Sequence, residues 1–249
     1  MKIKNNINKN IGKVVYIVEG DNDEPKLIID IFQKIFNYSI VRYDKLNDKI
    51  VELKQDNNKY SKVYIIPAKY SAISTLDIND DYFDEIFSKL SKYDLDIDNS
   101  ALYFLFDRDR QSNRPGVIKK NMSHFYNSRD NGEYRNGLFL LSYPSIESFY
   151  LNCFNDDTEF GSETEIKGYP INKDIEANNI NDGTCNILNI INTINNDEFN
   201  INMLDSFKDI NLNIFNYQEC KFNKDKKYIT LSLLFLSLID LGLIEIDES

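Results

Sequence analysis

The stretch ALYFLFDRDRQSNRPG, residues 101–116, decides the fold, because an unbroken apolar run ends there in a series of charged residues. A short apolar run bounded by polar turn formers is typical of a strand that is buried on both faces. Asp107 follows this run directly, and Asp109 comes two positions later. Residues two apart on a strand point to the same face, so the two carboxylates can approach one ion.

The stretch VVYIVEGDNDE, residues 14–24, repeats this pattern, because its apolar run ends directly in Glu19. Ligands of open α/β sheets bind outside the carboxyl ends of the strands. We therefore expect Glu19 to lie at the same sheet edge as Asp107 and Asp109. A third apolar run is followed shortly by Glu147 and then by a helix-like stretch.

These strand-end acids predict a metal site. Carboxylates about 4 Å apart repel each other by roughly 4 kcal/mol at an effective dielectric constant of about 20. A bound Mg²⁺ or Mn²⁺ would turn this repulsion into binding, because hard cations take oxygen ligands. The alternative is that the acids are helix N-caps and turn residues, which often follow strands.

Apolar runs alternate with amphipathic segments in the first part of the chain. This alternation predicts an α/β fold with a mostly parallel sheet flanked by helices. Strands are expected over Val14–Val18, Ser39–Tyr43, Lys62–Pro67, Ala101–Phe106 and Leu138–Ser142, and helices over Glu24–Phe36 and Tyr82–Tyr93. Residues 1–12 indicate a loose polar lead-in, and Asp44–Lys59 has no clear pattern.

The character of the sequence changes near residue 150. We expect an α/β domain over residues 1–150 and a mainly helical C-terminal region over residues 151–249. The last helix should end near Gly242, and LIEI after it should form a closing strand. Apolar residues recur before that point at helical spacing: Leu231, Leu234, Phe235, Leu238 and Leu241. They either close the C-terminal core or offer a surface to a partner.

Charge is distributed unevenly along the chain. The net charge of −11 argues against general nucleic-acid affinity. Residues 108–135, however, hold seven basic and three acidic residues, whereas residues 136–249 hold seven lysines and nineteen acids. A basic segment beside an acidic pair is expected of a site that does metal chemistry on a polyanion. The predicted phosphate contacts are Arg108, Arg110, Arg114, Lys119 and Lys120, and the alternative is an ordinary solvated loop.

Other features exclude several classes of protein. The three cysteines are far apart and odd in number, which fits neither a disulfide framework nor a zinc site. The first residues are polar and resemble no secretory signal. The longest apolar stretch, Ile229–Ile239, is too short to span a bilayer and predicts a core helix. We therefore expect a cytoplasmic protein that does not interact with membranes.

The order of these motifs resembles the Toprim fold, in which a strand with Glu-Gly after it precedes a strand with Asp-x-Asp after it. VEGDNDE, with Glu19 in second place, would be the glutamate motif, and FDRD would be the aspartate motif. KVYIIPAKYSAISTL, from Lys62, resembles the intervening strand and turn of OLD-type Toprim domains. LSYPSIESFYL resembles the segment after their last strand. The resemblance covers roughly residues 13–151.

The resemblance implies a nuclease with two-metal phosphoryl chemistry. In such sites two ions about 3.5–4 Å apart clamp the attacking and leaving oxygens of a phosphodiester. Asp107 and Asp109 would hold one ion, and Glu19 would bridge the ions or act as general base. Asp23 and Glu147 would supply the second ion. The implied cofactor is Mg²⁺ or Mn²⁺, as one or two ions, and the implied substrate is DNA or RNA.

The resemblance also implies a protein partner. OLD-type nucleases carry or borrow an ABC-type ATPase, and this chain has no GxxxxGK[ST] motif. Similarity to OLD-family and PARIS-type anti-phage defence effectors implies a nuclease that acts alone or is gated by a separate ABC-type ATPase. Two alternatives stay open: a non-catalytic Toprim-like binding or scaffold subunit, and an rRNA-processing maturase, which the acidic C-terminal half disfavours.

Overall fold

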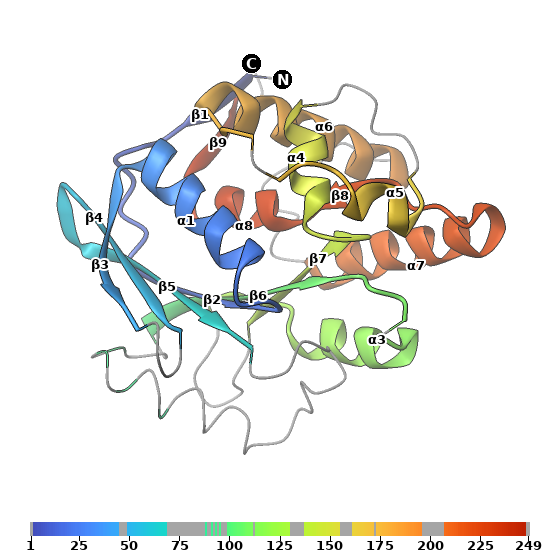
Figure 1. Ribbon diagram of the computed structural model, residues 1–249, viewed down its shortest axis with the longest axis horizontal. Helices are drawn as coiled ribbons and strands as arrows, with labels where there is room; N and C mark the ends of the chain where they lie inside the picture. Colours follow the sequence, from blue (N-terminus) through green and yellow to red (C-terminus); the bar gives the residue numbers. More distant parts are fainter. Residues whose placement is uncertain are drawn as a thin grey trace. The chain divides into compact units, whose positions relative to one another are not determined.

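The structure is a computed structural model of the chain. It describes residues 2–44, 49–68, 88, 91, 93, 95, 99–111, 113–129, 137–154, 161–171, 173–195 and 207–247. Within these ranges the fold is mixed α/β, as predicted (Figure 1). The helix expected over Tyr82–Tyr93 lies almost entirely outside the described residues.

The strands of the described residues form two sheets. The larger has the order β3-β4-β5-β2-β6-β7-β8, and the smaller pairs β1 with β9. The strands are β1 Lys2–Asn5, β2 Lys13–Val18, β3 Tyr38–Tyr43, β4 Val51–Gln55, β5 Asn58–Pro67, β6 Ser100–Asp107, β7 Leu138–Tyr143, β8 Leu231–Ser232 and β9 Ile244–Asp247. The helices are α1 Asp23–Phe36, α3 Pro115–His124, α4 Glu147–Phe154, α5 Glu163–Lys167, α6 Ala177–Asn195, α7 Phe207–Asp225 and α8 Leu234–Asp240.

The chain divides into two compact units. Unit 1 contains residues 1–9, 106–109 and 140–249, and unit 2 contains residues 10–105 and 110–139. The chain passes between the units within β6 and within β7, so both strands contribute residues to both. The expected domain boundary near residue 150 stays a prediction, because compact units need not fold independently.

Unit 2 contains the parallel centre of the larger sheet. Strand β2 pairs in parallel with β5 on one side and with β6 on the other, so Val18 lies opposite both Pro67 and Leu105. Strands β2 and β6 and the second half of β5 are buried apolar runs, which is the property that predicted them. The first half of β5 is polar and partly exposed, so this strand begins earlier than the predicted Lys62. Helix α1 packs on β3, β4 and β5. It begins with Asp23 and Glu24 at its positively charged end.

One strand of unit 2 was not predicted from the sequence. Strand β4 is antiparallel to both β3 and β5, and it lies in the segment that the sequence left without assignment. Its Glu52 is buried, and Lys62 Nζ donates to Glu52 Oε1 at 2.7 Å. The sequence of β4, VELKQ, alternates apolar and polar residues, but over a stretch too short to identify a strand inside a polar segment. The pairing with Lys62 compensates the burial of Glu52.

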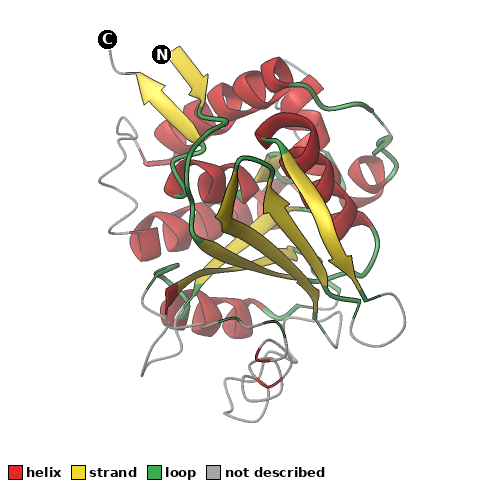
Figure 2. Cartoon of the chain, turned by 90° about the vertical axis from the view of Figure 1, so that its left-hand side faces the viewer, coloured by secondary structure: helices red, strands yellow, loops and turns green. Residues whose placement is uncertain are grey.

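Unit 1 brings the two ends of the described chain together. Strand β1 pairs antiparallel with β9, with Lys2 opposite Asp247 (Figure 2). The loose lead-in expected over residues 1–12 is therefore wrong for its first part, because Lys2–Asn5 is a strand. The closing strand expected from LIEI is confirmed.

The helices of unit 1 enclose an apolar core. Helix α6 packs against α4, α7 and α8. The Phe235 ring of α8 stacks on the Phe149 ring of α4 with 4.3 Å between centroids. The five apolar residues from Leu231 to Leu241 that recur at helical spacing are all buried, so they close the core and offer no surface to a partner. The core helix expected over Ile229–Ile239 is wrong for its first part, because Leu231 belongs to β8 and the helix begins at Leu234. Among the described helices, none combines the length and the apolar character needed to cross a bilayer.

Candidate functional site

The acids that follow β2 belong to unit 2. The backbone N–H of Glu19 donates to the carbonyl oxygen of Leu105 at 3.1 Å, so Glu19 continues the parallel pairing of β2 with β6. Its side chain is half-buried. Glu24 is only 7% exposed, and its Oε2 lies 2.4 Å from the position of an ideal Cβ on Gly20. Gly20 therefore leaves room for the Glu24 carboxylate beside the backbone that follows Glu19.

The structure distinguishes two adjacent acids at the start of α1. Asp23 was the predicted ligand of a second ion, but its side chain is exposed. Glu24, the next residue, is the buried acid that folds back over Gly20. In the sequence Glu24 is marked only as the start of the expected helix over Glu24–Phe36. The glycine four positions earlier was the available indication that a side chain closes over this turn.

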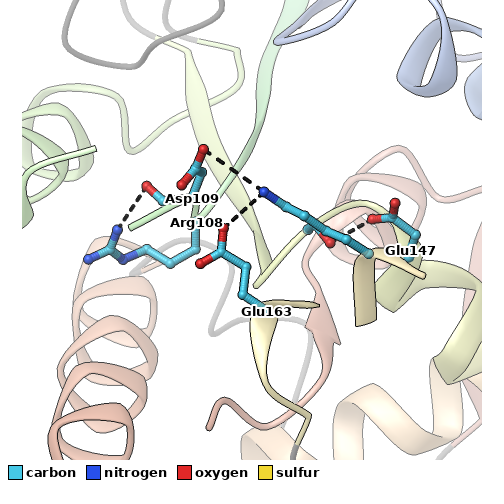
Figure 3. A network of polar contacts seen from close by, with 6 residues as sticks. Arg108, Asp109, Glu147 and Glu163 are labelled. Carbon is cyan, nitrogen blue, oxygen red and sulfur yellow. Dashed lines mark hydrogen bonds and ion pairs between the residues drawn. The ribbon is translucent and has the colours of Figure 1, made fainter. Parts of the chain in front are cut away.

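The Asp-x-Asp acids belong to unit 1. Asp107 is the last residue of β6, and Asp109 follows in the turn. The Lys167 Nζ of α5 lies 3.9 Å from Asp109 Oδ2 and 2.9 Å from Glu163 Oε1 (Figure 3). A lysine ammonium therefore occupies the space between an acid of the β6 turn and an acid of α5. Neither Lys167 nor Glu163 was singled out from the sequence.

The charge on Lys167 reports on the acids around it. Partial burial lowers the pKa of Lys167, but the hydrogen bond that Lys167 donates to Glu163 and the charges of Glu163, Asp109 and Asp107 outweigh burial. The pKa of Lys167 is therefore raised above its usual value, and the ammonium persists. Asp107 acts on the same cation as Asp109, as expected if both carboxylates serve one region.

The remaining predicted ligand of unit 1 has a different contact. Glu147 is the first residue of α4, and its Oε2 accepts a hydrogen bond from Ser145 Oγ at 2.6 Å (Figure 3). No group of three or more His, Cys, Asp or Glu residues arranged to hold a metal occurs among the described residues. The carboxylates of Asp109 and Glu163 instead share the Lys167 ammonium, which is a positive charge where a metal was predicted.

The basic segment divides into buried and exposed parts. Arg108 is completely buried, and its Nε donates to Glu219 Oε1 of α7 at 2.8 Å. This position corrects the prediction that Arg108 contacts phosphate, because a nucleic-acid backbone stays in solvent. Arg110 is half-buried. Arg114, which precedes α3, and Lys119 and Lys120 within α3 are exposed, so they are accessible to a polyanion.

Comparisons place this chain in no known group. No protein-family model, curated protein or solved structure matches it. The Toprim resemblance therefore rests on the motifs and on their positions in the fold, and it stays a prediction.

Replacing Lys167 with methionine is expected to tighten Mn²⁺ binding about two- to fivefold. The substitution removes a cation that competes for Asp109 and leaves the Asp107 carboxylate uncompensated. Partly exposed ion pairs of this kind contribute about 0.2–1 kcal/mol, which sets the size of the change. Isothermal titration with Mn²⁺ measures it. Lys221→Met is the control, because it removes a similar helical ion pair with Asp225 on α7. Equal or weaker binding by Lys167→Met would show that the lysine and the metal do not share these acids.

Proposed function

We propose that this protein is a metal-dependent nuclease with a Toprim-like centre that hydrolyses phosphodiester bonds in DNA or RNA. The centre would contain Glu19, Asp107 and Asp109. The proposal joins the motif resemblance to one observation of the fold, which is the parallel, in-register pairing of β2 with β6.

This pairing matters because an acid comes soon after the paired part of each strand. Val18 lies opposite Leu105, and the N–H of Glu19 bonds to the Leu105 carbonyl. Asp107 comes two residues after Leu105 and ends β6. The carboxyl ends of parallel strands are where open α/β sheets bind ligands. Acids at the ends of two paired parallel strands support the interpretation that they serve a ligand.

The donor set fits a hard divalent cation. Carboxylate oxygens are the ligands that Mg²⁺ and Mn²⁺ prefer, and Lys167 shows that a cation is accommodated next to Asp109. Bound Mg²⁺ would supply Lewis acidity and lower the pKa of a coordinated water. Asp107 and Asp109 would hold the ion, and Glu19 would orient the attacking water or accept its proton. Glu147, at the start of α4, is proposed for a second ion, and Glu24 is the better-buried acid near Glu19.

The substrate class follows from the exposed basic residues. Arg114, Lys119 and Lys120 lie at the start of α3 and along it. Phosphate contacts from such residues position a nucleic acid without reading its sequence. By analogy with OLD-family and PARIS-type effectors, we also propose that the protein acts in phage defence under control of a separate ABC-type ATPase.

Neutralising Arg114 and Lys119 together is expected to flatten the salt dependence of single-strand binding. Each phosphate contact contributes a slope of about −0.7 in a plot of log affinity against log salt concentration, so two lost contacts change the slope by about 1.4. Fluorescence anisotropy of a labelled oligonucleotide, titrated at several salt concentrations, measures the slope. Lys26 and Lys54 lie elsewhere in unit 2, and their double neutralisation should leave it unchanged. If the slope of the Arg114 and Lys119 variant equals that of the wild type, these two residues do not contact phosphate.

The direct test is a cleavage assay on single- and double-stranded DNA and RNA. The purified chain is incubated with Mg²⁺, with Mn²⁺ or with a chelator, both alone and with a candidate ABC-type ATPase partner. Cleavage that requires a divalent ion supports the proposal. Absence of cleavage under every condition, including the presence of the ATPase, would refute it.

A second function is favoured by one observation. The Lys167 ammonium satisfies Asp109 and Glu163 without a metal, as expected of a Toprim-like subunit that binds or scaffolds without catalysis. Such a subunit would still bind nucleic acid through α3 but would show no stabilisation by Mg²⁺ or Mn²⁺. Metal-dependent thermal unfolding therefore separates the two functions.

A further inference from the structure

Arg108 lies between the two acids of the Asp-x-Asp motif, yet it is completely buried. Its Nε donates to Glu219 Oε1 at 2.8 Å, and its Nη1 donates to the backbone carbonyl oxygen of Asp109 at 3.3 Å. Its own N–H donates to the carbonyl oxygen of Ser142 in β7 at 2.9 Å. The residue between the two carboxylates is therefore held through both its backbone and its side chain.

Two side chains of helix α7 contact the Arg108 guanidinium. Glu219 and Phe215 are four residues apart on α7, so they lie on the same helix face. The guanidinium carbon of Arg108 lies 5.5 Å from the centroid of the Phe215 ring. A planar guanidinium pairs with a carboxylate and with an aromatic face in ways that an ammonium cannot reproduce. The Asp-x-Asp turn is thus docked on one defined face of α7.

Buried aromatic rings surround the pair. The buried rings of Tyr143 and Tyr228 lie 6.3 Å apart, and Phe222 of α7 stacks on Tyr228 at 4.7 Å. Burial raises the pKa of Tyr143, with Arg108 acting in the opposite direction, so the tyrosine and the arginine share one environment. Gln218 exchanges two hydrogen bonds with the backbone of Ile229, at 2.8 and 3.0 Å. This cluster fixes α7 against its neighbours in unit 1.

We infer that Arg108 is a positioning residue that fixes the separation and direction of the Asp107 and Asp109 carboxylates by anchoring their turn to Glu219 of α7. The inference rests on the proposed function, because it assigns those carboxylates to a metal. A buried ion pair is often no more stable than an apolar pair of similar volume. The ion pair of Arg108 with Glu219 has a role beyond stability if it anchors the Asp-x-Asp turn. Groups that orient metal ligands affect metal affinity nearly as strongly as the ligands themselves.

The test compares three variants with the wild-type chain. The double variant Arg108→Met with Glu219→Met replaces the ion pair by apolar side chains. Glu219→Gln keeps the shape of the partner and an oxygen acceptor, and serves if the double variant does not fold. Arg108→Lys keeps the charge but loses the planar fork. Lys221→Met with Asp225→Asn, an exposed ion pair on the same helix, is the control.

Two measurements decide the outcome. Mn²⁺ affinity is expected to fall about 10- to 100-fold in the double variant and in Glu219→Gln, with an intermediate loss in Arg108→Lys and no loss in the control. For cleavage, kcat should fall while KM changes little, because α3 and not Arg108 contacts the substrate. Folded variants that keep wild-type Mn²⁺ affinity and kcat would overturn the inference.

Hydrogen exchange separates this inference from the proposed function. Backbone amides of residues 106–110 should exchange faster in each folded variant than in the wild type, whether or not any metal binds. If the wild type binds no Mn²⁺ but these amides exchange faster in the variants, the proposed function fails and the anchoring of the turn stands. If the amides exchange at the wild-type rate in every variant, the anchoring fails.

Discussion

Asp107→Asn is expected to abolish the stabilisation of this protein by Mg²⁺ or Mn²⁺ and to reduce cleavage at least about a hundredfold. A ligand that binds only the folded chain stabilises it by about 2.7 kcal/mol at a hundredfold excess over its Kd. In a chain of this size that corresponds to a rise of roughly 5–10 °C in thermal midpoint. Asp107 ends β6, and its charge helps to raise the pKa of the nearby Lys167, so it acts on cations in this region. Loss of that charge should remove the rise in thermal midpoint. The loss of cleavage follows because metal ions contribute several kcal/mol to transition-state stabilisation, at about 1.4 kcal/mol per factor of ten.

Scanning fluorimetry with and without each ion, followed by the cleavage assay, measures both effects. Asp225→Asn is the matched control, because it removes an exposed carboxylate from the same unit. Glu19→Gln should lose the rise in thermal midpoint as completely as Asp107→Asn, although Glu19 belongs to the other unit. If neither Mg²⁺ nor Mn²⁺ changes the thermal midpoint of the wild-type chain, the site assignment is wrong.

Phe235→Ala is expected to lower the free energy of unfolding by about 3–5 kcal/mol. The Phe235 ring is fully buried and stacks on Phe149 with an interplanar angle of 10°. On α6, an ideal Cβ at Gly183 would lie 2.5 Å from this ring, so the two helices pack closely around it. Truncation leaves a cavity that neighbouring backbone cannot readily fill. Urea denaturation followed by circular dichroism gives the change in free energy.

Tyr217→Ala provides the comparison for Phe235→Ala. Tyr217 is an aromatic residue of the same unit, but it is 38% exposed on α7. Its truncation should change the free energy of unfolding by no more than about 0.5 kcal/mol. If Phe235→Ala were equally mild, the last apolar segment would not be core, and docking of a partner there would have to be reconsidered.

The strands that could be predicted from the sequence are those that are buried along nearly their whole length. Strands β2, β6 and β7 are buried on both faces, so each appears as an apolar run that ends in a polar residue. Helix α1 could be predicted because its buried residues recur at helical spacing and its first turn is acidic. In these elements local sequence and tertiary environment agree.

The elements that could not be predicted depend on distant partners. Strand β1 is short and polar, and it becomes a strand only by pairing with β9 at the far end of the chain. Strand β4 carries Glu52, whose burial depends on Lys62 of the next strand. The alternation in β4 is too short to identify a strand by itself, and the pairing partner of each strand lies elsewhere in the sequence.

The candidate site shows the same division. Asp107 and Asp109 could be placed at the end of a strand because the run before them marks it. The burial of Arg108 could not be predicted, since its partner Glu219 is 111 residues away. Lys167 was missed for a similar reason, because a lysine in a short polar helix resembles ordinary surface until the fold brings it to Asp109.

The assembly of unit 1 from separate segments has a consequence for synthesis. Residues 10–105 and 110–139 of unit 2 leave the ribosome early, and chains generally fold from the N-terminus as they emerge. The turn with Asp109 must wait for Glu219 and α7, and β1 must wait for β9. At about 5–20 residues per second this delay is on the order of ten seconds. A nascent or truncated chain would thus carry the acids of the motif without the helix that anchors their turn, and the proposed nuclease activity would arise only when synthesis is nearly finished.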